Sequence, residues 1–245
     1  MAFEHRDIHY TESGYVDSGP GETVVLLDWT PWELGALRDG LASRYRVLGF
    51  DPPALAKSAE EAANAVSYAS EAAGLASFAL VGTSLGADAA LRLALMRPNL
   101  VSPLVLVSPT CVQPAASTAA DTPELAAAML AHPEAAGATP ADPDRTEALS
   151  ALANQWRRTE GDATRRLPEL ACATLVVLGQ EDRLVSREAG GIWKAQVPNC
   201  SICYVYDAGH AIAVDRPDAL VKVVLDFVER RETFVVENRS SLINP

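Results

Sequence analysis

The sequence contains few aromatic residues, few histidines and no excess of basic charge. Aromatic residues make up 6% of the 245 residues, four residues are histidine, and 32 Asp and Glu outnumber 20 Lys and Arg, for a formal net charge of −12. An acidic surface repels phosphate backbones and anionic lipid headgroups. We therefore expect neither a nucleic-acid-binding role nor a membrane-surface role.

Long apolar runs are also missing. No run approaches the roughly 20 residues that a membrane-spanning helix needs. The opening residues, Met1–Asp7, lack the apolar stretch of a secretory signal. The sequence therefore predicts a cytoplasmic protein.

The four cysteines do not have the pattern of a disulfide framework. Cys200 and Cys203 have CxxC spacing, but the run around them, CSICYVY, is typical of a β-strand. Side chains three residues apart on a strand point to opposite faces, so these two thiols are not expected to share a metal ion or a disulfide. We expect small buried side chains here, with no metal and no cofactor.

The chain does have enough apolar material for one large core. Hydrophobic residues make up 49% and charged residues 21% of the sequence, which is ordinary for a globular protein and excludes a disordered chain. A single domain of this size buries roughly three quarters of its unfolded surface. It can therefore fold without a disulfide, as one domain or as one domain with an insertion.

Short β-branched runs alternate along the chain with longer Ala- and Leu-rich stretches. Several of the runs are continuously apolar, which is typical of parallel strands buried on both faces. The alternation predicts an α/β fold with a doubly wound, mostly parallel sheet, preceded by an antiparallel hairpin strand at His5–Glu12. The predicted strands are Thr23–Asp28, Tyr45–Phe50, Phe78–Gly82, Val101–Ser108, Thr174–Gly179 and Ser201–Tyr206. The predicted helices are Leu34–Ser43, Ala59–Ala73, Leu85–Met96, Arg187–Gln196 and Ala219–Arg231.

The region from about residue 112 to residue 170 breaks this alternation. It is rich in Ala, Pro and Thr, contains no convincing strand, and predicts helices at Pro123–Ala131 and Arg145–Thr159. A disordered linker is the alternative interpretation. Apolar side chains nevertheless recur here at helical spacing, at Leu125, Met129, Leu149, Leu152 and Trp156. We therefore expect a helical insertion between two strands.

The segment from Val81 to Ala87, VGTSLGA, carries the strongest chemical signal. It matches G-x-S-x-G, follows a predicted strand and opens a predicted helix, which is the context of a nucleophile elbow. Gly82 and Gly86 are required there, because side chains at these positions would strike neighbouring backbone. Ser84 is thereby predicted to be a nucleophile at a helix N-terminus, where free N–H groups favour negative charge. A strand-to-helix turn with a bystander serine is the alternative.

A serine nucleophile needs a base, and the base needs an acid that orients it. Among the four histidines, His210 follows the last predicted strand of the sheet and comes next to a glycine that permits a tight turn. Asp182 follows another predicted strand, 28 residues earlier, which leaves room for one helix and one strand between the two. Ser84, His210 and Asp182 are therefore expected to meet at the carboxyl edge of the sheet.

Other acids compete with Asp182. Glu181 is adjacent to it and is the main alternative. Asp207 is expected to lie still on the strand, and capping of the following helix explains Asp215. Asp88 lies in the first turn of the elbow helix, where an acid is favourable without any catalytic role.

The chain order of Ser84, Asp182 and His210 resembles that of the serine-nucleophile branch of the α/β-hydrolase superfamily. The similarity covers nearly the whole chain and includes the elbow and the turns that carry the acid and the histidine. In that family, the helical insertion is a lid over the active site. The resemblance therefore implies a hydrolase core at 1–111 and 171–232, a helical lid at 112–170 and a C-terminal extension at 233–245.

The expected oxyanion site departs from the family pattern. Family members usually carry His-Gly after the third strand, whereas Asp28 and Trp29 stand at those places here. By position, the N–H groups of Thr30 and Leu85 would be the two donors, with Trp29 as the alternative to Thr30. An ionised Asp28 that faced the oxyanion would repel it. We therefore expect this carboxyl group either to enter a hydrogen-bond network of its own or to be kept protonated by its surroundings. The first is favoured, and Asp28 would then shape the following turn without touching substrate.

These residues predict a serine hydrolase that acts on a carboxylic ester or related acyl compound through an acyl-enzyme. The insertion and the pair Trp29 and Trp32 favour a fairly apolar small-molecule substrate of small to medium size, although both tryptophans could equally be packing residues. The altered Asp28 segment keeps open a non-esterase of the same fold: a C–C bond hydrolase, a lyase or a cofactor-independent oxygenase. A non-catalytic ligand-binding protein is a third hypothesis, which the complete set of three residues disfavours. The oligomeric state stays open, with a homodimer as one option.

Overall fold

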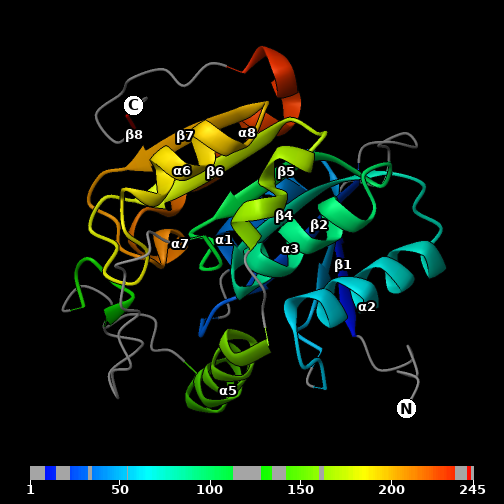
Figure 1. The fold of residues 1–245 in the computed structure, drawn as a ribbon, viewed down its shortest axis with the longest axis horizontal. Helices are drawn as coiled ribbons and strands as arrows, with labels where there is room; N and C mark the ends of the chain where they lie inside the picture. Colours follow the sequence, from blue (N-terminus) through cyan, green and yellow to red (C-terminus); the bar gives the residue numbers. More distant parts are fainter. Residues whose placement is uncertain are drawn as a thin grey trace.

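The computed structural model describes residues 9–14, 23–32, 35–53, 55–112, 128–133, 142–159, 163–234 and 242–243. Their strands form one eight-stranded sheet in the order β1-β3-β2-β4-β5-β6-β7-β8 (Figure 1). The six central strands run parallel, and β1 and β8 pair antiparallel at the two edges. The predicted α/β class and the doubly wound, mostly parallel sheet are thus confirmed. The strands are β1 (Tyr10–Gly14), β2 (Thr23–Trp29), β3 (Arg46–Phe50), β4 (Phe78–Ser84), β5 (Val101–Val107), β6 (Thr174–Gly179), β7 (Cys200–Val205) and β8 (Leu242–Ile243).

The first strand differs from its prediction. β1 begins at Tyr10, and residues 1–8, which include most of the predicted strand, lie outside the described part of the chain. Its antiparallel direction is as predicted. However, β1 pairs with β3, with Tyr10 opposite Phe50, and it does not pair with β2, the next strand along the chain. A hairpin would require β1 to pair with β2. Since β2 has β3 on one side and β4 on the other, the hairpin prediction is wrong.

Helices cover both faces of the sheet (Figure 1). One face carries α2 (Ala59–Ala72), α3 (Leu85–Met96) and α6 (Ala189–Gln196). The other face carries α1 (Gly35–Ala42) and α8 (Pro217–Arg230). The predicted bounds of these helices and of the six central strands differ from the observed bounds by at most two residues.

Strand side chains alternate between the two cores, as the strand period requires. In β7, Cys200 and Ile202 enter the core under α6, whereas Cys203 and Val205 enter the opposite core. The prediction that Cys200 and Cys203 lie on opposite faces is confirmed, and all four cysteines are free thiols.

The helices begin and end where the sequence provides local signals. Ser58 precedes α2, and its side-chain oxygen accepts a hydrogen bond from Glu61 N at 3.1 Å, which satisfies one free donor of the first turn. α3 ends at Met96, just before Pro98, which cannot continue a helix. Pro217 opens α8 at a position where its missing N–H has no intrahelical partner to lose.

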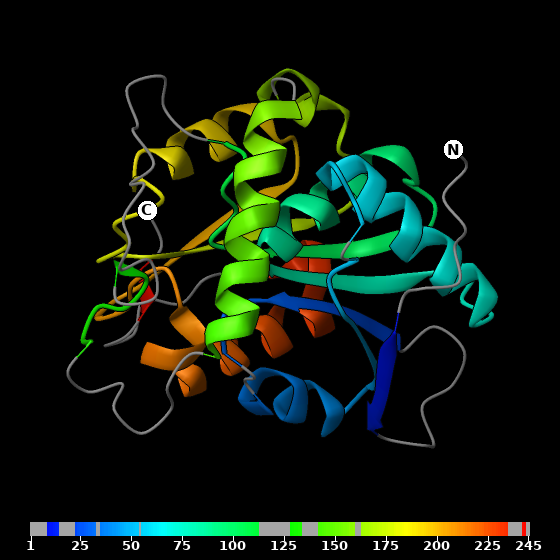
Figure 2. The ribbon, with the colours of Figure 1, turned by 90° about the horizontal axis from the view of Figure 1, so that it is seen from below.

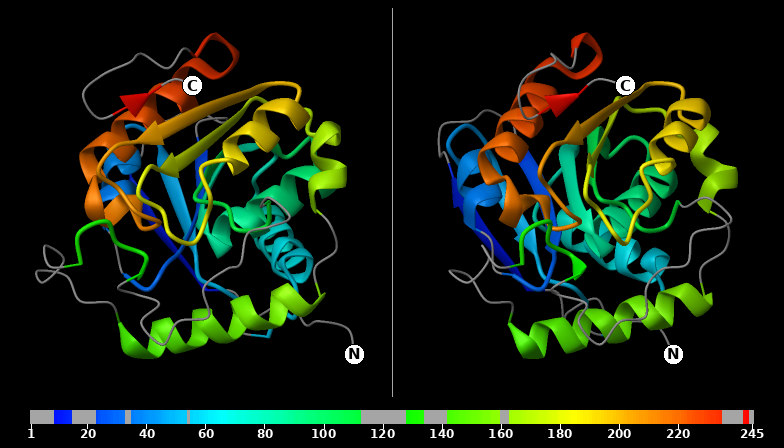
Figure 3. Two further views of the ribbon diagram at one scale, coloured as in Figure 1. Left: turned by 60° about the vertical axis from the view of Figure 1, so that its left-hand side comes forward. Right: turned by 90° about the vertical axis from the view of Figure 1, so that its left-hand side faces the viewer.

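The inserted segment is described in part. α5 (Pro143–Thr159) corresponds to the second predicted helix, and a 3-10 helix (Ala163–Glu169) follows it. Most of the predicted helix at Pro123–Ala131, with Leu125, lies outside the described residues. Figures 2 and 3 show α5 as a long helix that crosses one end of the sheet and lies outside the layers of flanking helices. Its apolar face is buried against the core of the α3 side through Leu149, Leu152 and Trp156.

Besides the 3-10 helix Ala163–Glu169 of the inserted segment, three short elements have no counterpart in the sequence analysis. They are α7 (Ile212–Asp215), a 3-10 helix (Arg231–Thr233) and β8. Phe234 packs edge-on against Phe227, with ring centroids 5.1 Å apart. The part of the C-terminal region that the structure describes therefore adds contacts to the α8 side and one short strand to the sheet. No helix among the described residues has the length and apolar character to cross a membrane.

Candidate active site

Ser84 ends β4, and α3 begins at the next residue. Its backbone has φ 52° and ψ −119°, a strained conformation of the kind that the elbow motif predicts. Two glycines make the turn possible. A Cβ on Gly82 would lie 2.4 Å from the carbonyl oxygen of Gly86, and a Cβ on Gly86 would lie 2.0 Å from that of Leu27. Real Cβ atoms do not approach backbone so closely, so only glycine fits at either position.

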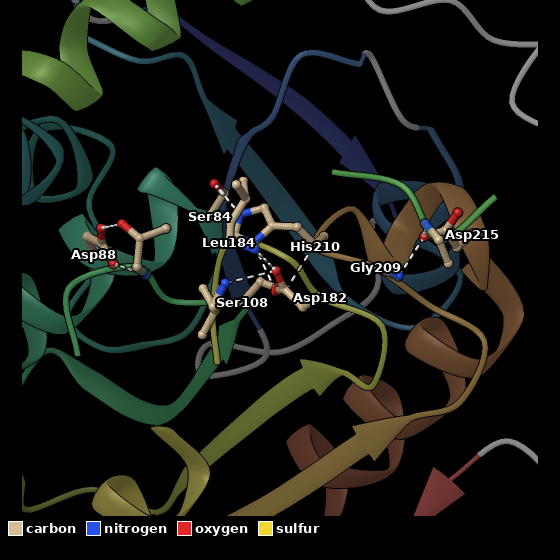
Figure 4. Close-up of polar contacts among 11 residues, drawn as sticks. Ser84, Asp88, Ser108, Asp182, Leu184, Gly209, His210 and Asp215 are labelled. Atoms are coloured by element: carbon tan, nitrogen blue, oxygen red, sulfur yellow. Dashed lines mark hydrogen bonds and ion pairs between the residues drawn. The ribbon is translucent and has the colours of Figure 1, made fainter. Parts of the chain in front are cut away.

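Ser84, His210 and Asp182 form one hydrogen-bonded chain at the carboxyl edge of the sheet (Figure 4). Ser84 Oγ lies 2.9 Å from His210 Nε2, and His210 Nδ1 lies 2.9 Å from Asp182 Oδ2. Ser84 is 8% exposed, and the side chains of His210 and Asp182 are 1% and 0% exposed. The structure therefore brings together the three residues that the sequence singles out. An imidazole at this distance from a hydroxyl can accept its proton.

The carboxylate of Asp182 is held by its own loop. Its Oδ1 accepts hydrogen bonds from Leu184 N at 2.8 Å and Val185 N at 2.9 Å, which leaves Oδ2 for His210. These backbone donors fix the direction of the carboxylate. Glu181, the alternative acid, is exposed to solvent.

Asp207 is engaged elsewhere. It lies in the turn after β7 with φ 59°, and not on the strand as predicted. Its Oδ1 lies 2.5 Å from His132 Nε2, and its Oδ2 lies 3.5 Å from Arg216 Nη1. The hydrogen bond to His132 holds the pKa of Asp207 below its ordinary value. Asp207 therefore links the inserted segment to the core and leaves His210 to Asp182.

The loop that carries His210 is held by two side chains whose part in this loop the sequence analysis did not predict. Ser108, with φ 49°, donates a hydrogen bond from Oγ to the His210 carbonyl oxygen at 2.9 Å. Asp215 Oδ2 accepts hydrogen bonds from Gly209 N at 2.7 Å and Ala131 N at 3.0 Å. The prediction that Asp215 caps the following helix is wrong, because it ends α7 and α8 begins without a side-chain cap.

The three candidate oxyanion residues lie beside the nucleophile. Trp29 is the last residue of β2 and stands opposite Ser84 in the parallel register with β4. Thr30 follows it and is buried. Leu85 is the first residue of α3, so its N–H has no acceptor within the helix. The role of these backbone N–H groups as donors to an anionic oxygen on Ser84 stays a prediction.

Asp28 accepts a hydrogen bond at Oδ1 from Thr83 Oγ1 at 2.7 Å. Burial raises the pKa of Asp28 above its ordinary value, while the hydrogen bonds from Thr83 and Thr30 and the charge of Arg145 act in the opposite direction. The hydrogen bond from Thr83 fits the predicted network, whereas the raised pKa fits a carboxyl group that is kept protonated, so the choice between the two stays a prediction. That this carboxyl group does not touch substrate stays a prediction.

Asp88, four residues after Ser84 on the elbow helix, also carries a buried carboxyl group (Figure 4). Its Oδ1 accepts hydrogen bonds from Thr110 N at 2.8 Å and Cys111 N at 3.0 Å, and its Oδ2 accepts one from Thr110 Oγ1. Burial raises the pKa of Asp88 against these hydrogen bonds. The sequence analysis accounts for Asp88 by its position in the first turn of α3. The structure adds a second role, because this side chain also ties α3 to the segment after β5.

Trp29 and Trp32 are packing residues, 1% and 2% exposed. Trp29 Nε1 donates a hydrogen bond to the Phe50 carbonyl at 2.7 Å, and its ring lies edge-on to Trp156 at 6.2 Å between centroids. Of the two interpretations of this pair, the structure favours packing. Within the described ranges, no group of three or more His, Cys, Asp and Glu side chains gathers as a metal site.

Comparison with known proteins gives consistent similarities. A model of the alpha/beta hydrolase family matches residues 20–223. The chain is 30% identical over 250 residues to "Putative carbamate hydrolase RutD" of Klebsiella pneumoniae (strain 342), with 84% of this chain and 91% of that protein covered. It is 29% identical over 250 residues to "Polyketide synthase ThaQ" of Burkholderia thailandensis, with 86% of this chain but only 12% of that much longer protein covered.

The fold is also similar to that of a solved structure, the enol-lactonase from Burkholderia xenovorans LB400. The TM-score is 0.74 over 91% of this chain and 96% of that one, at 17% identity. At this identity, the likeness concerns the fold alone.

Proposed function

The chain belongs to the α/β-hydrolase family, and we propose that it is a serine hydrolase that cleaves a carboxylic ester or a related acyl compound of small to medium size. One observation carries the proposal: the buried chain of hydrogen bonds from Ser84 through His210 to Asp182. A carbamate also presents a carbonyl carbon to a nucleophile. The similarity to a protein named as a carbamate hydrolase therefore supports the wider class of acyl compounds.

In the first half of the proposed reaction, Ser84 Oγ attacks the substrate carbonyl carbon while His210 Nε2 takes the hydroxyl proton. Asp182 keeps the imidazole in place and stabilises its positive form. The tetrahedral intermediate then collapses, its bond to the leaving group breaks, and His210 gives the proton to the departing alcohol or amine. Ser84 remains as an acyl ester.

In the second half, a water molecule attacks the acyl carbon while His210 takes one of its protons. The bond to Ser84 Oγ breaks, the serine regains its proton from His210, and the acid is released. Water is the only co-reactant, so the cycle needs no cofactor. In both halves, the N–H groups of Leu85 and Thr30, with Trp29 as the alternative to Thr30, hold the negative oxygen.

The inserted segment acts in this proposal as a lid. Its helix α5 crosses the end of β2 that carries the oxyanion residues, with the Trp156 ring against Trp29. Excluding water at this edge strengthens the electrostatic interactions within the site. The hydrogen bond from Thr83 to Asp28 supports ester-type chemistry over a non-esterase reaction, since it gives this carboxyl group a partner within the protein.

A fluorophosphonate probe and a panel of nitrophenyl esters and carbamates test the proposal. The wild-type protein is expected to incorporate one phosphonyl group, on Ser84. Ser84→Ala should lose the labelling and about 10³-fold or more of ester turnover, with unchanged thermal unfolding. Ser43→Ala is the matched control, because Ser43 is an exposed serine that bonds to the Gly40 carbonyl at the end of α1. Labelling of another serine, or full turnover by Ser84→Ala, would refute the mechanism.

A further inference from the structure

Arg145 connects helix α5 to the backbone that follows β2. Its Nε donates a hydrogen bond to the Thr30 carbonyl oxygen at 2.6 Å, and its Nη2 donates one to the Asp28 carbonyl oxygen at 2.8 Å. A backbone hydrogen bond from Asp142 N to the Pro31 carbonyl, at 3.0 Å, lies beside them. Three carbonyl groups within four residues are thus held from the start of one helix.

The direction of the Arg145 side chain is set by the way α5 begins. Asp142 Oδ1 accepts hydrogen bonds from the N–H groups of Asp144 at 2.9 Å and Arg145 at 3.3 Å, as a helix cap does. Thr146 closes the turn, with its N–H 2.9 Å from the Asp142 carbonyl oxygen. The first turn of α5, from which the Arg145 side chain extends, is therefore fixed. The planar guanidinium group can then donate to two carbonyl groups at once.

We propose that Arg145 is a positioning residue for the oxyanion site, an inference that rests on the proposed serine-hydrolase function. The peptide unit between Trp29 and Thr30 carries the proposed Thr30 donor, and it lies between the two carbonyl groups that Arg145 holds. The β2–β4 register places this peptide beside the nucleophile, because Trp29 stands opposite Ser84. Donors act on the oxyanion only within a narrow range of positions, so support of this peptide by Arg145 bears on the transition state.

The charge of Arg145 supports the same role. Asp28 introduces a carboxyl group next to a site that must hold a negative oxygen, and an unbalanced carboxylate there would raise the energy of the oxyanion. Arg145 bonds to the main chain of Asp28 and is close enough for its charge to act on the Asp28 carboxyl. When the Asp28 carboxyl group is ionised, the guanidinium thus offsets its negative charge, and in either state it fixes the backbone.

Two substitutions and a matched control test the inference by kinetics. Arg145→Gln is expected to lower kcat for ester hydrolysis about 10²-fold, with KM changed less than about threefold, because the lost support matters only when charge develops on oxygen. Affinity for a trifluoromethyl ketone, which forms an oxyanion on Ser84, should fall in parallel with kcat. Arg145→Lys should recover part of the loss, since an ammonium can reach one carbonyl. Glu147→Gln, an exposed change on the same helix, should match wild type.

A second measurement does not depend on turnover. Hydrogen exchange of the peptide that contains residues 28–32 should become faster in Arg145→Gln and stay unchanged in Glu147→Gln. Unchanged exchange in Arg145→Gln would overturn the inference even if the protein proved not to be an esterase. A rise in KM with kcat intact would overturn it as well, because Arg145 would then contact substrate. Loss of thermal stability with kcat preserved would reduce Arg145 to a purely structural contact.

Discussion

Asp88→Ala should destabilise the protein more than any single lost contact would, because one carboxylate serves three donors. The substitution leaves Thr110 N, Cys111 N and Thr110 Oγ1 without their acceptor. A donor left unsatisfied costs about 1–3 kcal/mol when buried. Two effects reduce this cost. Thr110 and Cys111 are half-buried, so water can reach some of the freed donors, and the variant no longer has to bury a carboxyl group. We expect a net loss of about 2–4 kcal/mol in the free energy of unfolding.

Thermal unfolding by calorimetry or circular dichroism gives the comparison. For a chain of this length, each kcal/mol lowers Tm by roughly 2–4 °C, so Asp88→Ala should melt roughly 5–15 °C below wild type. Asp88→Asn is the matched variant, because its Oδ1 can still accept from both N–H groups and its amide can donate to Thr110 Oγ1. Its loss should stay within about 1 kcal/mol. Equal losses in the two variants would refute the hydrogen-bond argument.

The pH dependence of the same pair gives a second check. Burial raises the pKa of Asp88 in the folded protein above its value in the unfolded chain. The protonated carboxyl group therefore contributes fully to the free energy of unfolding below the ordinary carboxyl pKa of about 3.9. This contribution is lost as the pH rises through the higher pKa of the folded protein. The stability of wild type relative to Asp88→Asn should fall over that window and then level off. A relative stability that rises with pH would show that the folded protein lowers this pKa instead.

Two further outcomes concern Asp28 and the strand cysteines. Asp28→Asn should lose less than about tenfold in kcat/KM, because the amide oxygen still accepts from Thr83, and its pH–rate profile should keep both limbs of wild type; a lost limb would favour the non-esterase chemistry. Burial raises the pKa of the Cys200 and Cys203 thiols to about 12. Iodoacetamide at about pH 8 should therefore alkylate them only after denaturation, and peptide mass spectrometry that found either modified in the native protein would contradict this.

The strands of the central sheet could be predicted because strands that are buried on both faces have continuously apolar sequences. Val24 to Leu27 form an unbroken apolar run, and in the structure these side chains divide between two cores on the two faces of β2. The edge strand β1 has no such run, and its partner depends on the order of the strands in the sheet. Its hairpin prediction was wrong for that reason.

The candidate site could be predicted because each of its three residues lies at or soon after the end of a strand. Ser84 is the last residue of β4, Asp182 lies in the turn after β6, and His210 lies in the loop after β7, so parallel strands bring them to one edge. Ser108 and Arg145 could not be found in this way. The carbonyls they bind lie 102 and up to 117 residues away in the chain, and no local pattern encodes such a pairing.

Contacts of this kind tie the inserted segment and the residues directly before it to three parts of the proposed active site. Asp88 on the elbow helix holds Thr110 and Cys111, which lie directly before this segment. Its middle part donates to Asp215 and accepts from Ala211 N at 2.8 Å, next to His210. Its helix α5 holds the backbone after β2 through Arg145. A change in this segment can therefore shift the nucleophile helix, the base or the oxyanion donors without touching substrate. Under the proposed function, variation in its sequence would then change the rate.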